Sequence, residues 1–384
     1  MSNSQVVREL LATLAEIKDM NASEARTLPP AFYTSEEFLE LEKKEIFLKE
    51  WLCLGRVGEV PNPGDYFPIQ ILDEPLLVAR GHDGKIRVLS NVCRHRSSIV
   101  VEGRGNSGHF VCPYHAWTYK NDGQLLRAPH MDEVETFDVR NCRLPELKSE
   151  VWQGFIFVNL DGNATPLEPR LEGLEPYIRN QHPGDMVYQW SREHACNANW
   201  KCVAENALEG YHLSTLHRRT LHSSTPTRLS EKLPCGESYT AYKSGYDPKF
   251  RPQMPVHPDV TDEEKRFSVL FFIYPSLVVS VAARRMVYLY FFPCSASRLV
   301  VRQGLATFDP QPSAETLETM LDPRIVEEDL EQMERLGRGL KSRYVASSPL
   351  GPLNLEGTVW DIFQYVARKL VTEEARGTSI RRAS

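Results

Sequence analysis

The chain has 384 residues, of which 41% are hydrophobic and 25% are charged, values that are ordinary for a globular protein. This length is enough for two or three domains, each with its own core. The net charge of −6 argues against nucleic acid as a partner, and no apolar run approaches the roughly 18 residues that a membrane-spanning helix needs. The start of the chain does not resemble a signal peptide, so we expect a cytoplasmic protein.

Residues 1–45 are predicted to be helical. Apolar residues near the start recur at helical spacing: Val6, Val7, Leu10, Leu11, Leu14 and Ile17. This amphipathic helix should lie on the body of the protein or on a neighbouring subunit. After a break at residues 27–30, Ser35 should begin a second helix with Glu36 and Glu37 in its first turn, where the helix dipole favours acids.

Residues 46–165 contain short β-type runs separated by turn signals. The runs are Pro75–Val78, Ile86–Leu89, Phe110–Val111 and Gly154–Asn159. Asn-Pro-Gly-Asp, His-Asp-Gly and Asn-Asp-Gly segments lie between them and indicate turns. This pattern predicts a small β-domain that ends at a linker near residues 161–163.

Residues 166–375 mix helical and strand patterns and predict a larger domain. Helices are expected at residues 198–218, 323–343 and 359–370. Long strands of an antiparallel sheet are expected at residues 269–281, 287–292 and 299–308. The tail at 376–384 is basic and polar and is expected to fray.

Two cysteine–histidine pairs form the strongest local motif. Cys93-Arg94-His95 is followed, after sixteen residues, by Cys112-Pro113-Tyr114-His115. In a reducing compartment such closely spaced cysteines indicate metal ligands rather than disulfides. Two thiolates and two imidazoles fit either a closed tetrahedral zinc site or a Rieske [2Fe–2S] cluster. Zinc motifs usually group Cys with Cys and His with His, so the mixed loops favour the cluster and leave zinc as the alternative.

A cluster alone only transfers electrons, so chemistry on an organic molecule needs a second site. His212 and His217 are candidate iron ligands, but on a regular helix residues five apart point about 140° away from each other. They can share one ion only if the helix is broken, and the weak helix formers Ser214 and Thr215 lie between them. Two histidines and a carboxylate would make the facial triad of non-haem iron oxygenases.

Asp329 is the candidate carboxylate. It lies inside the apolar stripe of the predicted 323–343 helix, which consists of Ile325, Val326, Leu330, Met333 and Leu336. A carboxylate on a buried face is costly unless it is paired or binds a metal, and a structural Asp paired with an Arg or a cap is the alternative. The other acids of this helix should form its solvated face: Glu327, Glu328, Glu331 and Glu334.

These motifs resemble those of the oxygenase α-subunits of Rieske non-haem iron oxygenases over about residues 27–370. The resemblance rests on Cys-x-His-x16-Cys-x-x-His, on Asn-Trp-Lys with Glu-Asn and Tyr-His-x4-His, and on Glu-Asp in the late helix. It implies an α+β fold. An antiparallel Rieske [2Fe–2S] domain at 46–165 would be inserted into a helix-grip, START-like catalytic domain at 166–375, on which residues 1–45 would pack as helices.

The resemblance also implies roles for individual residues. The implied ligands of the cluster are Cys93, His95, Cys112 and His115. The implied ligands of a mononuclear Fe(II) are His212, His217 and Asp329. Glu209 matches the carboxylate that links the cluster of one subunit to an iron ligand of its neighbour. Asn206 matches a residue near the iron, with a plain helix-side hydrogen bonder as the alternative.

The implied activity is that of a terminal oxygenase using O₂ and two electrons from a separate reductase. It would hydroxylate a small organic substrate, by monooxygenation or by oxidative N- or O-demethylation, and would assemble as a homotrimer. Glu at position 209 resembles the branch that contains carnitine and choline monooxygenases and glycine betaine or stachydrine demethylases. The alternatives are an aromatic ring-hydroxylating oxygenase and, against the evidence of the triad, an electron-transfer Rieske protein without catalysis.

Two further features bear on the substrate. Six aromatic residues at strand spacing would either form a cation–π cage for an onium group or fill the core: Phe271, Phe272, Tyr274, Tyr288, Tyr290 and Phe291. Arg284 and Arg285 lie between two predicted strands. They would either reach a substrate carboxylate or form a solvated hairpin tip.

Overall fold

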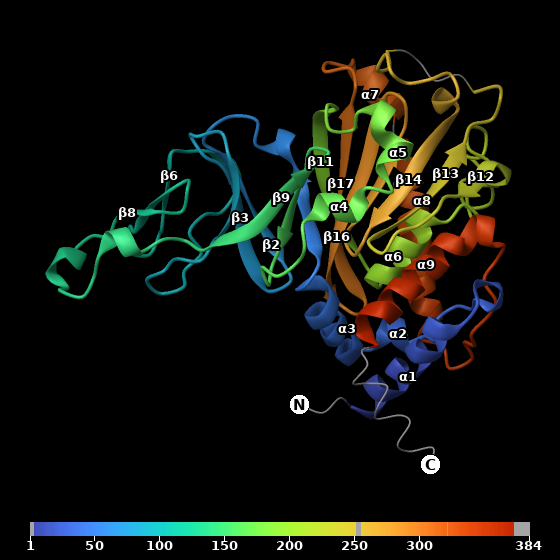
Figure 1. Ribbon diagram of the computed structural model, residues 1–384, viewed down its shortest axis with the longest axis horizontal. Helices are drawn as coiled ribbons and strands as arrows, with labels where there is room; N and C mark the ends of the chain where they lie inside the picture. Colours follow the sequence, from blue (N-terminus) through green and yellow to red (C-terminus); the bar gives the residue numbers. More distant parts are fainter. Residues whose placement is uncertain (1–3, 251–254, 321, 372–384) are drawn as a thin grey trace. The chain divides into compact units, whose positions relative to one another are not determined.

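The computed structural model describes residues 4–250, 255–320 and 322–371 (Figure 1). The predicted tail at 376–384 lies outside these residues. The chain divides into two compact units. The large unit combines Met1–Glu50 with Pro166–Ser384, and the small unit is Trp51–Thr165. The small unit is therefore inserted, in sequence, into the large one.

The small unit is built from two antiparallel sheets. One has seven strands in the order β1-β10-β9-β4-β3-β2-β5, and the other has three in the order β6-β7-β8. Their bounds are β1 Trp51–Arg56, β2 Asp65–Ile71, β3 Glu74–Arg80, β4 Ile86–Ser90, β5 Gly105–Asn106, β6 His109–Val111, β7 Thr118–Lys120, β8 Leu125–Arg127, β9 Glu146–Trp152 and β10 Phe155–Asn159. All four predicted β-runs of this region are confirmed.

The large unit contains a seven-stranded antiparallel sheet in the order β11-β17-β16-β15-β14-β13-β12. The bounds are β11 Val187–Cys196, β12 Ser230–Lys232, β13 Tyr239–Gly245, β14 Phe267–Ile273, β15 Leu277–Val281, β16 Arg285–Ser295 and β17 Arg298–Thr307. The single strand predicted at 269–281 was wrong. It is a hairpin of β14 and β15 that turns at Pro275, whose missing N–H suits a turn better than a central ladder.

The helices of the large unit come from both ends of the chain. They are α1 Gln5–Asp19, α2 Ala31–Thr34, α3 Glu36–Glu42, α4 Leu167–Leu171, α5 Glu175–Ile178, α6 Trp200–Leu208, α7 Ala314–Met320, α8 Pro323–Gly339 and α9 Leu353–Leu370. α3 begins where predicted, because the Ser35 hydroxyl accepts the Phe38 N–H at 3.2 Å. None of the described helices is long and apolar enough to cross a membrane.

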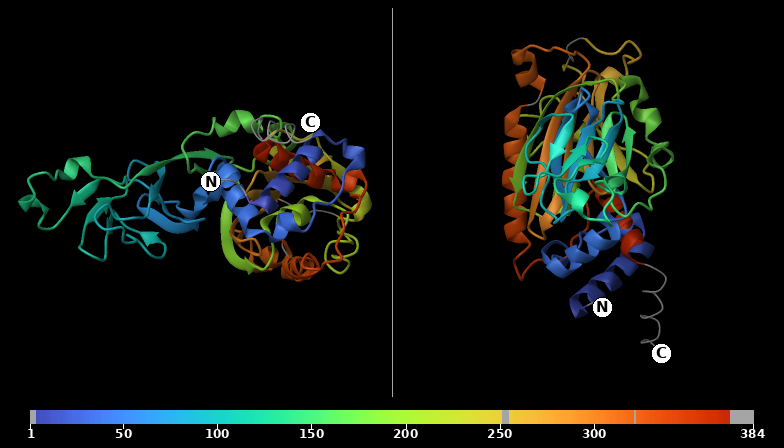
Figure 2. Two further views of the ribbon diagram at one scale, coloured as in Figure 1. Left: turned by 90° about the horizontal axis from the view of Figure 1, so that it is seen from below. Right: turned by 90° about the vertical axis from the view of Figure 1, so that its left-hand side faces the viewer.

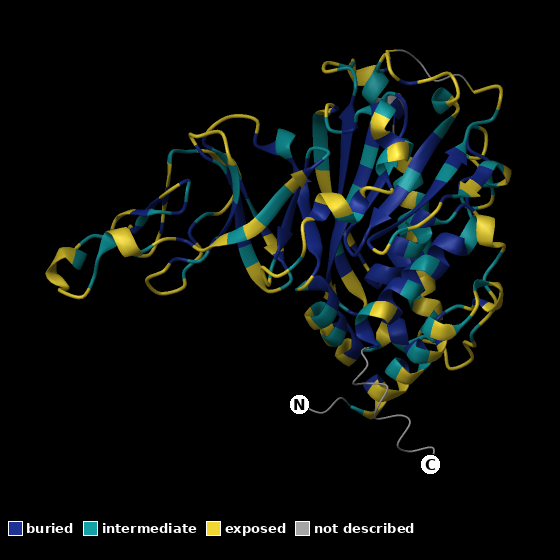
Figure 3. Cartoon of the chain, in the orientation of Figure 1, coloured by how far each residue is buried: buried dark blue, intermediate teal, exposed yellow. Residues whose placement is uncertain are grey.

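The core of the large unit lies between its sheet and its helices. α9 packs against β12 and β13, and most of its residues are buried (Figure 3). α1 buries Val7, Leu10, Leu14 and Ile17 and packs on α9 (Figures 1 and 2). The amphipathic first helix thus lies on the body of its own chain. The antiparallel sheet with a long helix along it confirms the predicted α+β class.

The predicted start of the β-region at residue 46 differs from the start of the small unit. Ile46 and Phe47 belong to a π-helical turn, Lys43–Phe47, that follows α3. Both side chains are fully buried in the large unit. The first β-strand begins only at Trp51.

Candidate functional site

The two cysteine–histidine loops of the small unit share one backbone conformation. In each, the residue four positions after the cysteine has a positive φ, 56° at Ser97 and 57° at Ala116. Each of these residues donates its N–H to the cysteine carbonyl, at 3.1 Å from Ser97 and 3.0 Å from Ala116. The N–H groups of Cys93 and Cys112 are used in the same way, each bonding at 2.8 Å to the carbonyl five residues later. The loops are therefore a matched pair that can hold one group between them.

The side chains of these loops separate into a buried and a more exposed pair. Cys93 and Cys112 are 3% and 2% exposed, whereas His95 is exposed and His115 half-buried. The two imidazole rings lie with their centroids 4.6 Å apart, and His95 stacks on Trp117 at 4.9 Å. The two cysteines are thus the buried donors of the loops, and the two imidazoles are the more accessible ones.

This arrangement fits a two-iron cluster better than zinc. Where the chain is described, two groups of possible ligands have all their donor atoms within 4.8 Å of one another, and neither contains a cysteine. A tetrahedral zinc would need all four donors around a single ion. A Rieske cluster instead places the thiolates on one iron and the imidazoles on the other. The zinc alternative therefore does not fit.

The second constellation comes together in the large unit. One donor atom each from His212, His217 and Asp329 lies within 4.8 Å of the other two. The rings of the two histidines have centroids 5.1 Å apart, and His217 Nε2 lies 3.2 Å from Asp329 Oδ1. Asn206 donates a hydrogen bond of 2.9 Å to the same oxygen of Asp329. The structure thus brings together four of the residues singled out in the sequence.

The helix predicted over 198–218 was too long. α6 ends at Leu208, whose carbonyl accepts a hydrogen bond of 2.5 Å from the Thr358 hydroxyl of α9. Two residues later, the Gly210 N–H donates to the Leu355 carbonyl of α9 at 3.2 Å. Backbone groups that would continue the helix are therefore used by the first turns of α9. Successive turns follow, and they bring both histidines to one point. The predicted break exists, but it begins before Ser214.

Each histidine of the constellation is held at Nδ1 by a glutamate. Glu209 Oε1 contacts Nδ1 of His212, and Glu328 Oε2 lies 2.7 Å from Nδ1 of His217. Glu328 also accepts the Thr220 hydroxyl at 2.7 Å. Both imidazoles consequently present Nε2 toward the shared point. The prediction that Glu328 lies on the solvated face of α8 was wrong, because its partner belongs to the turns that wrap around that helix.

Electrostatics favour a cation at this point. Burial alone would lower the pKa of His217, but the carboxylates of Asp329 and Glu328 raise it. Carboxylates therefore dominate the surroundings of the two imidazoles. A divalent ion bound by two neutral imidazoles and one carboxylate matches this charge and the facial triad of non-haem iron.

A cavity of about 220 Å³ adjoins the triad. Alternate residues of the sheet line one side of it, and α6, α8 and the turns after α6 line the other. α8 contributes Ile325, Val326, Asp329, Leu330 and Met333. Leu336 of the predicted stripe does not take part and is 40% exposed. The cavity wall near the triad is mainly aliphatic.

The structure places the six candidate aromatic residues and the two candidate arginines in different surroundings. All six candidate aromatic residues are buried in the core, and none of them lines this cavity. Apart from histidines, Tyr242 is the single aromatic ring among the described residues of its wall. Arg285 does line the cavity, and both arginines are half-buried rather than at a solvated tip.

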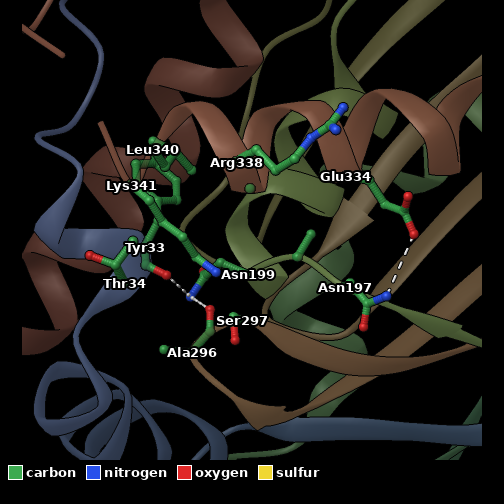
Figure 4. Close-up of a pocket in the computed structure, with 12 residues that line it drawn as sticks. Tyr33, Thr34, Asn197, Asn199, Ala296, Ser297, Glu334, Arg338, Leu340 and Lys341 are labelled. Atoms are coloured by element: carbon green, nitrogen blue, oxygen red, sulfur yellow. Dashed lines mark hydrogen bonds between the residues drawn. The ribbon is translucent and has the colours of Figure 1, made fainter. Parts of the chain in front are cut away.

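A larger pocket of about 410 Å³ lies elsewhere in the large unit (Figure 4). Asn199 extends one side-chain amide to the carbonyls of Tyr33 and Ala296, at 3.2 and 2.9 Å, and so joins three segments of the chain. Asn197 reaches Glu334 in the same pocket, at 3.5 Å. These polar groups bond to one another, which indicates a structural role.

Comparison with known proteins identifies a family of domains for each of the two units. A Rieske [2Fe-2S] domain matches residues 50–138, and the catalytic domain of ring-hydroxylating alpha subunits matches residues 184–372. The carnitine monooxygenase oxygenase subunit of Acinetobacter baumannii is 32% identical over 84% of this chain and 87% of its own length. The glycine betaine monooxygenase oxygenase subunit of Chromohalobacter salexigens is 36% identical over 56% of this chain and 51% of its own.

The fold agrees with solved structures as well. The quaternary ammonium Rieske monooxygenase CntA in complex with L-carnitine superposes with a TM-score of 0.80 at 28% identity, covering 92% of this chain and 99% of that one. The small unit thus corresponds to a domain that holds a Rieske cluster, and the large unit to one that holds a mononuclear iron. The chain belongs to the Rieske non-haem iron oxygenases, as an oxygenase subunit that acts on a small substrate and receives its electrons from a reductase.

Proposed function

We propose that this oxygenase inserts one oxygen atom into a C–H bond of a small molecule, by hydroxylation or by oxidative N- or O-demethylation. The observation that carries the proposal is the triad of His212, His217 and Asp329 in the wall of an aliphatic cavity. One atom of O₂ enters the substrate, and two electrons and two protons convert the other to water. Where the hydroxylated carbon is bound to N or O, the product breaks down to formaldehyde and the demethylated compound.

The residues of the large unit would have separate roles in binding the metal, orienting its ligands and holding the substrate. The triad would hold an iron whose open positions supply the chemistry of O₂. Asn206 would fix the orientation of Asp329 through its 2.9 Å hydrogen bond, and Glu209 and Glu328 would fix the two imidazoles. The aliphatic wall would exclude water and place an apolar part of the substrate against the triad.

The residues of the small unit would deliver electrons. Cys93, His95, Cys112 and His115 would hold the cluster, and the Tyr119 hydroxyl, 3.3 Å from Cys93 Sγ, would be a hydrogen-bond partner of one thiolate. Hydrogen bonds to the sulfurs are one of the means by which a protein sets the potential of such a cluster.

The triad is tested by Asp329→Ala. The variant should lose the mononuclear iron and all product formation while keeping the absorption spectrum of the cluster, because the ligand lies in the other unit. Oxygen uptake and product analysis with a reductase measure the first effect, and visible spectroscopy the second. Glu327→Gln, an exposed acid of the same helix, is the control. Near-normal turnover by Asp329→Ala would refute the assignment.

The proposal includes a homotrimer in which the cluster of one subunit serves the iron of the next. A related structure is described as revealing inter-subunit electron transfer. In this chain the Glu209 carboxylate contacts His212, and its second oxygen also accepts the His212 N–H at 3.1 Å. A carboxylate has lone pairs for a further partner, such as a cluster histidine of a neighbour.

Glu209→Gln separates a bridging role from a local one. If Glu209 bridges, both metal centres stay occupied, but reoxidation of the reduced cluster by substrate and O₂ slows and product yield falls. Rapid mixing of the reduced enzyme measures this. Glu231→Gln, an exposed position in β12, is the control. Reoxidation at the wild-type rate with normal product yield would exclude the bridge, and a mass other than that of a trimer would exclude the assembly.

A further inference from the structure

Three polar side chains in the wall of the triad cavity have no hydrogen-bond or ion-pair partner among the described residues. They are His194, Arg285 and Gln303, from β11, β16 and β17. His194 Nε2 is buried without a hydrogen bond. In the described chain, the guanidinium of Arg285 and the amide of Gln303 likewise have no hydrogen-bond or ion-pair partner. Buried polar groups are nearly always paired, so the buried Gln303 amide and His194 Nε2, together with the half-buried Arg285, indicate that a ligand completes them.

Arg285 is the costliest of the three. Burial lowers the pKa of Arg285, Tyr246 opposes this effect and Arg284 adds to it, yet a guanidinium remains charged at any ordinary pH. A partly desolvated cation without a counter-ion is strongly unfavourable. The acids nearest the triad cannot serve it, because Asp329 bonds to His217 and Asn206, and Glu209 and Glu328 bond to imidazoles. In the part of the chain that the structure describes, Arg285 thus has no acidic partner, and an anionic ligand would complete it.

Arg285 stands where two chambers meet. It lines the triad cavity and also a neighbouring pocket of about 310 Å³, whose described wall is more polar. That second wall includes Arg284 and the hydroxyl-bearing residues Ser224, Thr225, Ser244, Tyr246 and Ser268. The triad residues line only the first chamber. A molecule that spans the junction would thus have an aliphatic environment at one end and a cationic one at the other.

We propose that the substrate is a small organic acid whose carboxylate binds Arg285 and whose reacting end is uncharged. The fork of a guanidinium matches the two oxygens of a carboxylate, and an uncharged apolar group fits the aliphatic wall beside the triad. The inference rests on the proposed oxygenase function and narrows its substrate class. It also separates this chain from relatives named for quaternary ammonium substrates, because a cation–π cage consists of several aromatic rings and, apart from histidines, Tyr242 is the one ring in the described wall of the chamber that contains the triad. Tyr246 and Phe250 line the second chamber, away from the triad.

Three probes of nearly equal shape test the proposal. γ-Butyrobetaine carries a carboxylate and a trimethylammonium group. 5,5-Dimethylhexanoate replaces the ammonium nitrogen by carbon, and 5,5-dimethylhexanamide also lacks the carboxylate charge. Binding of each to the iron-loaded enzyme is measured by calorimetry without O₂ or reductase. We expect the uncharged-tail acid to bind at least about tenfold more tightly than its amide, as a charge-assisted hydrogen-bond pair implies, and more tightly than γ-butyrobetaine.

Variants of Arg285 test whether its guanidinium causes the preference for the acid over the amide. Arg285→Gln should abolish the preference for the acid over the amide, and Arg285→Lys should retain part of it, because the charge stays and the fork is lost. Arg302→Gln is the matched control. Arg302 lies in the same sheet but does not line the cavity, whereas its neighbours Val301 and Gln303 do. Its side chain forms an ion pair of 2.9 Å with Glu193. This control should keep the wild-type preference.

Binding and turnover test different claims. An acid that binds no better than its amide, or less tightly than γ-butyrobetaine, overturns the proposal without any variant being needed. An unchanged preference in Arg285→Gln overturns the role of Arg285. An enzyme that prefers the acid but never oxidises any substrate would instead contradict the proposed function and leave the carboxylate site standing.

Discussion

At the scale of single residues, the glutamate behind His217 has the clearest consequence. Glu328 bonds to Nδ1 of His217, and a carboxylate there makes the imidazole a stronger ligand and fixes its orientation. Glu328→Gln should lower the affinity for the mononuclear iron about 10- to 100-fold. Competition with a chelator measures this, and Glu327→Gln should not differ from the wild type. Equal affinities in Glu328→Gln and wild type would show that the contact has no role at the metal.

A second residue-scale prediction concerns Glu205 in α6. Burial raises its pKa to about 8, against the opposing effects of the Tyr33 hydroxyl, which donates to it at 2.9 Å, and of Lys201. The folded protein therefore keeps a proton that the unfolded chain loses near pH 4.5. The resulting stabilisation is complete below pH 4.5 and is lost as the pH rises through about 8.

Urea unfolding measures this dependence at about pH 5 and about pH 8. The wild type should lose unfolding free energy over this range. Glu205→Gln, which carries no charge at either pH, should lose less. If both proteins showed the same change with pH, Glu205 would not be the group that titrates.

Sequence patterns indicated candidate metal ligands more readily than the residues that support those ligands. Cysteine–histidine spacing and an acid in an apolar stripe are local signals, so they are visible without a structure. Glu328 gives no such signal, because its partner lies 111 residues earlier in the chain. Glu328 is next to Asp329 in the sequence, which is compatible with a place near the metal site, but helix periodicity assigned Glu328 to the solvated face. His194 and Gln303 were missed for the same reason, since only the folded sheet brings them to the cavity.

At the scale of elements, the turns after α6 decide whether the triad forms. Gly210 lies in the first of them, where a Cβ atom would come within 2.2 Å of Ser230 Oγ and 2.5 Å of Ser230 Cβ. Gly210→Ala should displace the turns, weaken iron binding and destabilise the protein by about 1–3 kcal/mol. Gly339→Ala, at the end of α8, meets no atom within 4 Å and should be nearly neutral. Iron content and urea unfolding provide the comparison, and wild-type iron binding in Gly210→Ala would contradict the prediction.

The strands show where periodicity was informative and where it was not. β11 was not predicted because it is an edge strand whose residues are mostly polar and partly exposed. β16 was predicted, but both of its faces are apolar. Arg285, Val287 and Leu289 line the cavity, whereas Tyr288 and Tyr290 alternate with them and belong to the core. An alternation of apolar with apolar residues does not reveal which face carries the site, and this is why the sequence left a cage and the core as alternatives for these aromatic residues, of which the core is confirmed.

At the scale of the whole molecule, the two metal centres belong to separately packed units. Cys93→Ser should therefore remove the cluster and leave the triad iron, so that iron content falls from about three to about one per chain and the brown colour is lost. Cys142→Ser is the control, since Cys142 packs against the same small-unit core but belongs to neither loop pair. A colourless wild-type protein with stoichiometric zinc would contradict the cluster assignment.

The insertion of one unit into the other also sets the order in which the protein can fold during synthesis. The small unit is contiguous, and β1 pairs with β10, so it is complete once residue 165 has left the ribosome. α1 must wait for α9, its packing partner. At about 5–20 residues per second, the interval between Asp19 and Leu353 lasts roughly 20 to 60 seconds. During that time the apolar face of α1 lacks its partner α9 and stays exposed to solvent or to other proteins.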